Sequence, residues 1–153
     1  MNMPSATEPP SLTVRAGLRI PGRAELAEFA AVLQRRLTGG RAFHCLLTGD
    51  TELRRLNRRF RALNKTTDVL SFPAGVAPGD SLGDIAVSLD RARAQARAFG
   101  HQVSDELRIL MLHGVLHLLG MDHETDSGEM ARAERSWRNK LGLPAGLIER
   151  VSS

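Results

Sequence analysis

The chain has 153 residues and a formal net charge of +4 at pH 7, with 42% hydrophobic and 25% charged residues. This length and composition are those of a single soluble globular domain with a core of its own. No apolar run is long enough to span a bilayer and no signal peptide is visible, so the sequence predicts a cytoplasmic protein with no membrane contact. The single cysteine, Cys45, cannot form an internal disulfide, as expected in a reducing compartment.

Hydrophobic periodicity divides the chain into four strands and five helices. Apolar residues at every second position predict strands, a spacing near 3.6 predicts helices, and Gly or Pro marks most of the ends. The sequence therefore predicts an α/β (α+β) domain, in which a small mixed four-stranded sheet packs with about five helices. In chain order the predicted elements are strand 12–20, helix 26–37, strand 42–48, a helix capped by Asp50 or Thr51, strands 67–73 and 83–88, helix 90–99, a helix capped by Ser104, and a last helix opened by Asp126 and ended by Gly142.

The chain is expected to consist of a short tail and one domain. Residues 1–11 are rich in Pro, Ser and Thr and predict a disordered N-terminal extension. Residues 12–150 are predicted to form a single domain, because no linker or internal repeat interrupts them. Within this domain, His44 is expected to be an ordinary strand side chain, and Cys45 a small buried one.

The helix after Asp50 combines an apolar face with a strongly basic one. Leu53, Leu56 and Phe60 are spaced to face the core. Arginine suits phosphate binding and base stacking, and a basic balance is typical of nucleic-acid binding, although a charge run is most often a solvated face. The arginines of this outer face are Arg54, Arg55, Arg58, Arg59 and Arg61.

The stretch from His113 to His123 carries the strongest functional signal. His113 and His117 lie four residues apart on a predicted central apolar helix, so they project from one face, one turn apart. Gly120 tolerates the left-handed backbone that ends a helix and turns the chain back, after which His123 follows. Three imidazoles with a fourth position open are the ligand set of a catalytic zinc site. The sequence therefore predicts one Zn²⁺ per chain.

The same stretch carries a family resemblance. Its spacing is also that of metzincin proteases, but Gly114 stands where those proteases need a glutamate as general base. The segment resembles instead the signature of the YbeY family of bacterial endoribonucleases, His-Gly-x-Leu-His-Leu-x-Gly followed by an aromatic residue, Asp and His. Met121 replaces the aromatic residue. The segment Thr67–Pro73 matches the second signature of that family residue for residue.

The resemblance spans roughly residues 12–142 and implies a metal-dependent endoribonuclease specific for single-stranded RNA. It implies a role in small-subunit (16S) ribosomal RNA 3′-end maturation and ribosome quality control. The implied partners are ribosomal RNA, the small ribosomal subunit and assembly factors. Asn57-x-x-Phe60-Arg61 resembles a further family element whose arginine is implicated in activity, so the resemblance singles out Arg61 as a catalytic residue.

Three neutral imidazoles leave a bound divalent ion its positive charge, which can activate water and polarise a phosphoryl oxygen. Arg61 could bind that phosphate bidentately. The sequence assigns no general base, since Asp122 and Glu124 beside His123 also suit an orienting role. Two alternatives stay open: a zinc-stabilised, non-catalytic ribosome-assembly module with a fourth protein ligand, and a metal hydrolase of another substrate such as a peptide, against which the missing glutamate argues.

Overall fold

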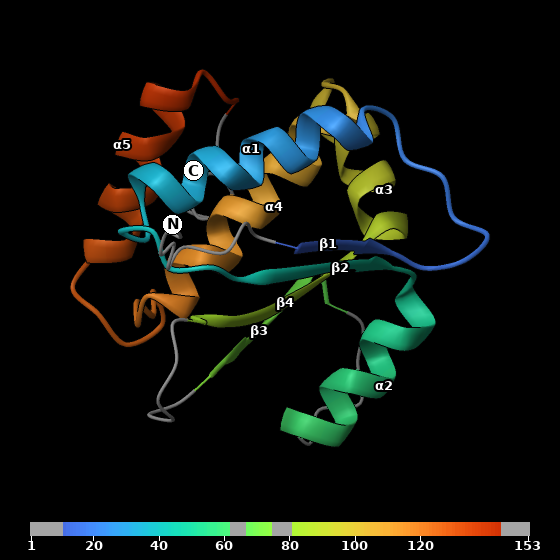
Figure 1. The fold of residues 1–153 in the computed structure, drawn as a ribbon, viewed down its shortest axis with the longest axis horizontal. Helices are drawn as coiled ribbons and strands as arrows, with labels where there is room; N and C mark the ends of the chain where they lie inside the picture. The colour runs from blue at the N-terminus through green and yellow to red at the C-terminus, as the bar shows by residue number, and fades with distance from the viewer. Residues whose placement is uncertain (1–10, 62–66, 75–80, 145–153) are drawn as a thin grey trace, which may run out of the picture.

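The computed structural model describes residues 11–61, 67–74 and 81–144. Within them the chain forms the predicted four strands and five helices in the predicted order, so the α/β prediction is confirmed (Figure 1). The elements are β1 Ser11–Val14, α1 Arg23–Arg36, β2 His44–Thr48, α2 Asp50–Arg61, β3 Val69–Pro73, β4 Gly83–Ser88, α3 Leu89–Phe99, α4 Val103–Leu118 and α5 Glu129–Leu141.

The four strands form one mixed sheet in the order β1-β2-β4-β3. The first three strands in this order are parallel, and β3 pairs antiparallel with β4 at one edge. Val69 lies opposite Val87, and Phe72 lies opposite Asp84. Because successive side chains of a strand point to opposite faces, Ser71 and Phe72 lie on different sides of the sheet.

Helix α4 forms the centre of the main core on one face of the sheet. Eleven of its 16 residues are buried, and α1, α3 and α5 lie on the same side of the sheet (Figure 1). Gly114 allows a close approach, because a Cβ atom there would lie 2.4 Å from Cγ2 of Ile85. The carbonyl oxygen of Gly114 accepts a hydrogen bond of 3.0 Å from the Ser71 hydroxyl. These contacts fix α4 against β3 and β4.

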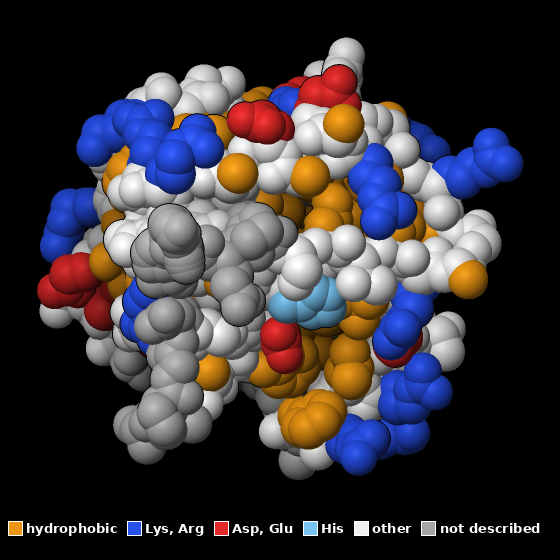
Figure 2. All heavy atoms as spheres, viewed as in Figure 1, with side chains coloured by type: hydrophobic (Ala, Val, Ile, Leu, Met, Phe, Trp, Pro, Cys, Tyr) orange, Lys and Arg blue, Asp and Glu red, His pale blue; other side chains and the backbone are white. Residues whose placement is uncertain are grey.

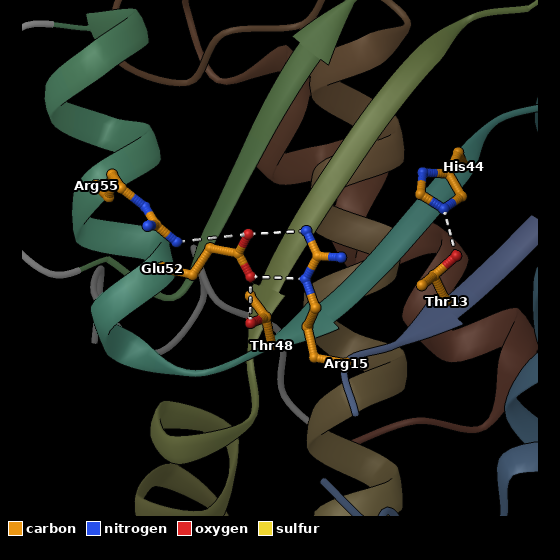
Figure 3. A network of polar contacts seen from close by, with 6 residues as sticks. All are labelled: Thr13, Arg15, His44, Thr48, Glu52 and Arg55. Atoms are coloured by element: carbon orange, nitrogen blue, oxygen red, sulfur yellow. Dashed lines mark hydrogen bonds and ion pairs between the residues drawn. The ribbon is translucent and has the colours of Figure 1, made fainter. Parts of the chain in front are cut away.

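Helix α2 lies on the opposite face of the sheet, where it forms a second, smaller core (Figure 1). Figure 3 shows the polar contacts at its first turn: the Glu52 carboxylate accepts hydrogen bonds of 2.9 and 2.8 Å from Arg15 and one of 2.6 Å from Thr48. Hydrogen bonding from Arg15, with a smaller contribution from Thr48, lowers the pKa of Glu52 to about 2. The start of α2 is therefore tied to the ends of β1 and β2.

The structure corrects two predicted boundaries. β1 ends at Val14 and not at Ile20, because a turn at residues 16–17 interrupts the alternation. Helix α4 begins one residue before the predicted cap, Ser104, and Gln102 is its N-cap. The Gln102 backbone N–H donates to the carboxylate of Asp105, the third residue of the helix, at 3.4 Å, which is the backward hydrogen bond of a capping box centred on Gln102 and not on Ser104.

The beginning of α5 also differs from the prediction. The N-cap is Gly128, and Asp126 lies outside the helix. Its carboxylate accepts hydrogen bonds of 2.9 Å from the backbone N–H groups of both Gly128 and Met130, which lowers the Asp126 pKa below its usual range. Asp126 therefore does accept hydrogen bonds from N–H groups at the start of α5, but it lies two residues before the N-cap, Gly128.

The prediction that Phe60 faces the core is wrong. Leu53 is buried and Leu56 half-buried, but 58% of Phe60 is exposed. Its ring packs edge-on against Phe72 with the ring centroids 5.3 Å apart, and this contact leaves more than half of the residue exposed. The spacing of these residues predicted the correct helix face but not how far along the helix the sheet covers it.

Other predictions concern the ends and single residues. The extension predicted over 1–11 lies outside the described residues, except for Ser11, which begins β1. Cys45 is buried, and burial raises the pKa of its thiol to about 12. His44 is a strand side chain, as predicted, and its Nε2 lies 2.9 Å from the Thr13 hydroxyl (Figure 3).

None of the helices in the described ranges combines the length and the apolar character that a membrane crossing requires.

Candidate metal centre

The end of α4 and the turn after it bring three histidines together. His113 and His117 lie on one face of α4, and Gly120 follows with a φ of 97°, a left-handed conformation that suits glycine. Its backbone N–H donates to the His117 carbonyl at 2.9 Å, which closes the turn. His123 then lies beside the other two, and one ring nitrogen from each of the three residues falls within 4.8 Å of the others.

Two of the three rings are held by hydrogen bonds through Nδ1. Nδ1 of His113 lies 2.8 Å from Oε2 of Glu134, and Nδ1 of His117 lies 2.9 Å from the carbonyl oxygen of Met121. A metal-bound histidine usually donates its second ring N–H to such an oxygen, which fixes the ring and the tautomer. In both residues this arrangement leaves Nε2 to face the centre of the cluster.

Glu134 is a functional residue that the sequence analysis missed. It comes from α5 and has no exposed surface. It lies four residues after Met130, so it falls on the apolar stripe of the last helix, where a charged residue is unexpected. That position on the buried face was the signal that could have identified it.

The surroundings of His117 favour its neutral imidazole form. Burial, and to a smaller degree the neighbouring His113, lowers the pKa of His117 below its usual value. Neutral imidazole is the form that binds a metal ion. Imidazole nitrogens also suit Zn²⁺ and related transition metals better than Mg²⁺ or Ca²⁺. The donor set and its hydrogen bonds therefore fit the predicted zinc ion.

The histidines open into a cavity of about 450 Å³, called here the histidine cavity. Its opposite wall comes from β3 and the residues before it, including Asp68, Ser71 and Pro73. Asp122 and Glu124 also line it, and the Asp122 carboxylate accepts a hydrogen bond of 3.0 Å from the backbone N–H of Glu124. The cavity offers room beside the three imidazoles for a substrate group.

Gly114 does not face this cavity. A Cβ atom at this position would meet Ile85 at 2.4 Å and Val69 at 3.2 Å, which are side chains of β4 and β3. The glutamate of a metzincin therefore has no space at this position. From the sequence, Gly114 showed only that the general base of a metzincin is missing. The structure adds a physical reason for the glycine, which is the close packing of α4 on the sheet.

Arg61 is the last residue of α2. Its side chain lies outside the described part of the structure. Asn57, the first residue of the Asn57-x-x-Phe60-Arg61 pattern, lies about one helical turn before Arg61 and is buried, with 1% exposure. The structure thus brings together the three predicted metal ligands, and the role of Arg61 stays a prediction.

Comparison with known proteins gives consistent results. The family model described as "Endoribonuclease YbeY" matches residues 24–142. A protein of that name from Solibacter usitatus (strain Ellin6076) is 57% identical over 149 residues, which is 97% of this chain and 99% of the relative. Another from Nautilia profundicola is 54% identical over 105 residues, 69% of this chain and 76% of the relative. The solution structure of a Thermotoga maritima protein is 27% identical with a TM-score of 0.56, and the match covers 85% of this chain and 93% of that one.

Proposed function

Because the chain belongs to the endoribonuclease YbeY family, we propose that it is a zinc-dependent endoribonuclease that cleaves single-stranded RNA. His113, His117 and His123 hold the ion, one per chain. The observation that carries the proposal is the convergence of three imidazole nitrogens within 4.8 Å at the edge of a cavity. Two of the rings are oriented by hydrogen bonds to oxygen, as metal-binding histidines usually are.

A catalytic role fits this cluster better than a structural one. Among the described residues, the group of potential ligands contains three histidines and no fourth side chain. Structural zinc sites are usually closed by four protein ligands, whereas catalytic sites keep one position for water or substrate. A bound Zn²⁺ would supply a Lewis acid that lowers the pKa of water and polarises the scissile phosphate.

The protein's own groups hold and orient the reacting parts. Glu134 accepts a hydrogen bond from Nδ1 of His113, which fixes the orientation and tautomer of that ring and leaves Nε2 to bind the ion. The carbonyl oxygen of Met121 does the same for His117. Arg61 binds the non-bridging oxygens of the scissile phosphate, where negative charge increases in the transition state. We assign no general base.

In the cell we propose that the chain acts in the cytoplasm on small-subunit (16S) ribosomal RNA, in 3′-end maturation and in ribosome quality control. Its partners there are the small ribosomal subunit and assembly factors. The family membership supports this role. The arginine-rich chain and its positive net charge suit a nucleic-acid substrate.

The test is a single-turnover assay with a labelled single-stranded RNA and its duplex as substrates. Protein that has been stripped by a chelator should be inactive, and addition of about one equivalent of Zn²⁺ should restore cleavage of the single strand. His117→Ala should bind far less zinc and cleave nothing, while His101→Gln, at a histidine outside the cluster whose hydrogen bond to Glu106 a glutamine can replace, should keep its zinc and its cleavage activity. Cleavage by His117→Ala at the normal rate would reject the proposal.

A further inference from the structure

A second hollow lies on the α2 face of the sheet, and the proposed chemistry does not use it. Its volume is about 680 Å³, within the ~300–1,000 Å³ range of small-molecule pockets. Leu56 and Phe60 of α2 form one side, and Phe72 of β3 forms part of the floor. Figure 2 shows hydrophobic side chains gathered on this face next to α2, with Lys and Arg side chains beside them. We call this hollow the α2 groove.

An exposed aromatic ring borders the α2 groove. Phe60 is 58% exposed, and the edge-on contact with Phe72 leaves much of its ring open to solvent. The Arg59 guanidinium carbon lies 5.4 Å from the centre of the same ring. An aromatic face in a concave apolar surface can stack on a flat ring of a ligand, and the guanidinium group beside it can bind a negatively charged group of the same ligand.

The charges around the α2 groove differ from one side to the other. Arg58 and Arg59 are exposed on the α2 side. Asp84 lies on the strand side, where its carboxylate is 63% exposed and 3.7 Å from Nδ1 of His44. A phosphate is attracted to the first side and repelled from the second, whereas a carboxylate readily accepts a hydrogen bond from a base amino group. A strand of RNA with phosphates along α2 and bases in the groove matches both sides.

The α2 groove also adjoins the histidine cavity. Ser71 and Pro73 of the edge strand β3 line both hollows. The two hollows are therefore separated by the width of one strand, and a ligand that passes over β3 can occupy both.

We propose that the α2 groove binds nucleobases of the single-stranded RNA next to the cleavage site, with one base stacked on Phe60. This inference rests on the proposed function, because it takes RNA as the substrate of the histidine cavity. Stacking is tolerant of sequence, since every base has a π face, and arginines beside the ring bind the adjoining phosphates. Phe60 is thus a substrate-binding residue and not a core residue.

The test measures binding of a labelled single-stranded RNA by fluorescence anisotropy, with chelator present so that affinity is read without cleavage. Phe60→Leu keeps the apolar contact with Phe72 but removes the π face, and should weaken binding at least about fivefold. Phe60→Trp should retain affinity. Phe99→Leu is the matched control, because Phe99 is 52% exposed on α3, away from both hollows, and should bind RNA normally.

Salt dependence separates stacking from general charge attraction. Phe60→Leu should leave the slope of log Kd against log salt unchanged, because it removes no charge. Arg59→Ala should reduce that slope by about 1. Thermal unfolding of each variant confirms that the fold is intact.

Two results would overturn the proposal: normal affinity in Phe60→Leu, which would leave the α2 groove to a protein partner, or equal losses in Phe60→Leu and Phe99→Leu. The outcomes also distinguish this proposal from the proposed function. A protein that binds RNA through Phe60 but cleaves nothing with zinc would contradict only the proposed function. A protein that cleaves RNA with zinc but does not need Phe60 for binding would contradict only the groove.

Discussion

Nδ1 of His113 lies 2.8 Å from Oε2 of Glu134, and neither residue is more than 4% exposed. The pair joins α4 to α5 through a hydrogen bond at the back of a predicted metal ligand. Because the carboxylate is buried, its hydrogen bond to the ring is shielded from competing water. We therefore regard Glu134 as the residue that orients His113.

We expect Glu134→Gln to weaken zinc binding by about 10–100-fold, because partners of this kind usually contribute that much to metal affinity. Competition with a chromogenic chelator measures the effect. The matched control is Glu106→Gln, which removes the carboxylate that lies 2.7 Å from Nε2 of His101 and is equally buried. Both variants should lose stability, but only the first should lose zinc affinity. An equal loss of affinity in the two would show that the effect is one of general stability.

Gly114→Ala should destabilise the protein. The new methyl group would lie 2.4 Å from Cγ2 of the buried Ile85, and overpacking of this kind costs about 1–3 kcal/mol. The gain in helix propensity from Gly to Ala is about 1 kcal/mol, so we expect a net loss. Urea unfolding measures the change. Adding Ile85→Ala to Gly114→Ala should cost less than Ile85→Ala costs in the unmodified protein, and simple additivity of the two changes would argue against the clash.

Arg61→Ala should reduce RNA cleavage about a hundredfold without changing zinc content or fold, if the guanidinium contacts the scissile phosphate in the transition state. Arg61→Lys should recover only part of the rate, because an ammonium group cannot reproduce the planar fork. Arg58→Ala and Arg59→Ala, assayed with a substrate at saturating concentration, are the controls on the same helix. Equal small losses in all three variants would mean that the arginines act only through general electrostatic attraction.

Glu52→Gln should lower stability at neutral pH by about 1 kcal/mol, an amount kept small because half of the Arg15 side chain is exposed. The folded-state pKa of Glu52 is lowered to about 2, so the ionised carboxylate stabilises the fold above the ordinary glutamate pKa. This contribution is lost as the pH falls from about 4.5 towards about 2. Urea midpoints measured from about pH 7 to about pH 3 should therefore show the gap between the variant and the unmodified protein narrowing. A difference between the two urea midpoints that grows as the pH falls would contradict the expected direction of the effect.

Local signals were sufficient to predict that the three histidines converge. The i, i+4 spacing of His113 and His117 and the left-handed turn at Gly120 are properties of the backbone, and they hold in the structure. Hydrophobic periodicity also predicted the existence and order of each strand and helix, although β1 ends earlier than expected. These features depend on neighbours in sequence, which is why the sequence alone was enough.

Features that depend on tertiary contacts were missed. Phe60 has the spacing of a core residue, but the packing of α2 on the sheet does not cover it. Glu134 looks like one more charged residue of a polar helix until α5 is placed behind His113. The role of Gly114 required the position of Ile85, a residue 29 positions earlier in the chain. In each case the deciding neighbour comes from another element.

The contact between Gly114 and Ile85 has an evolutionary consequence. A glutamate next to the first metal-binding histidine is a single amino-acid replacement away in sequence, and it would complete the constellation of a metalloprotease. In this fold, that replacement would drive a side chain into the sheet before the carboxylate could reach the cavity. The glutamate of a protease could be accommodated at this position only if β4 moved away from α4, so the packing of one helix on one strand opposes that replacement.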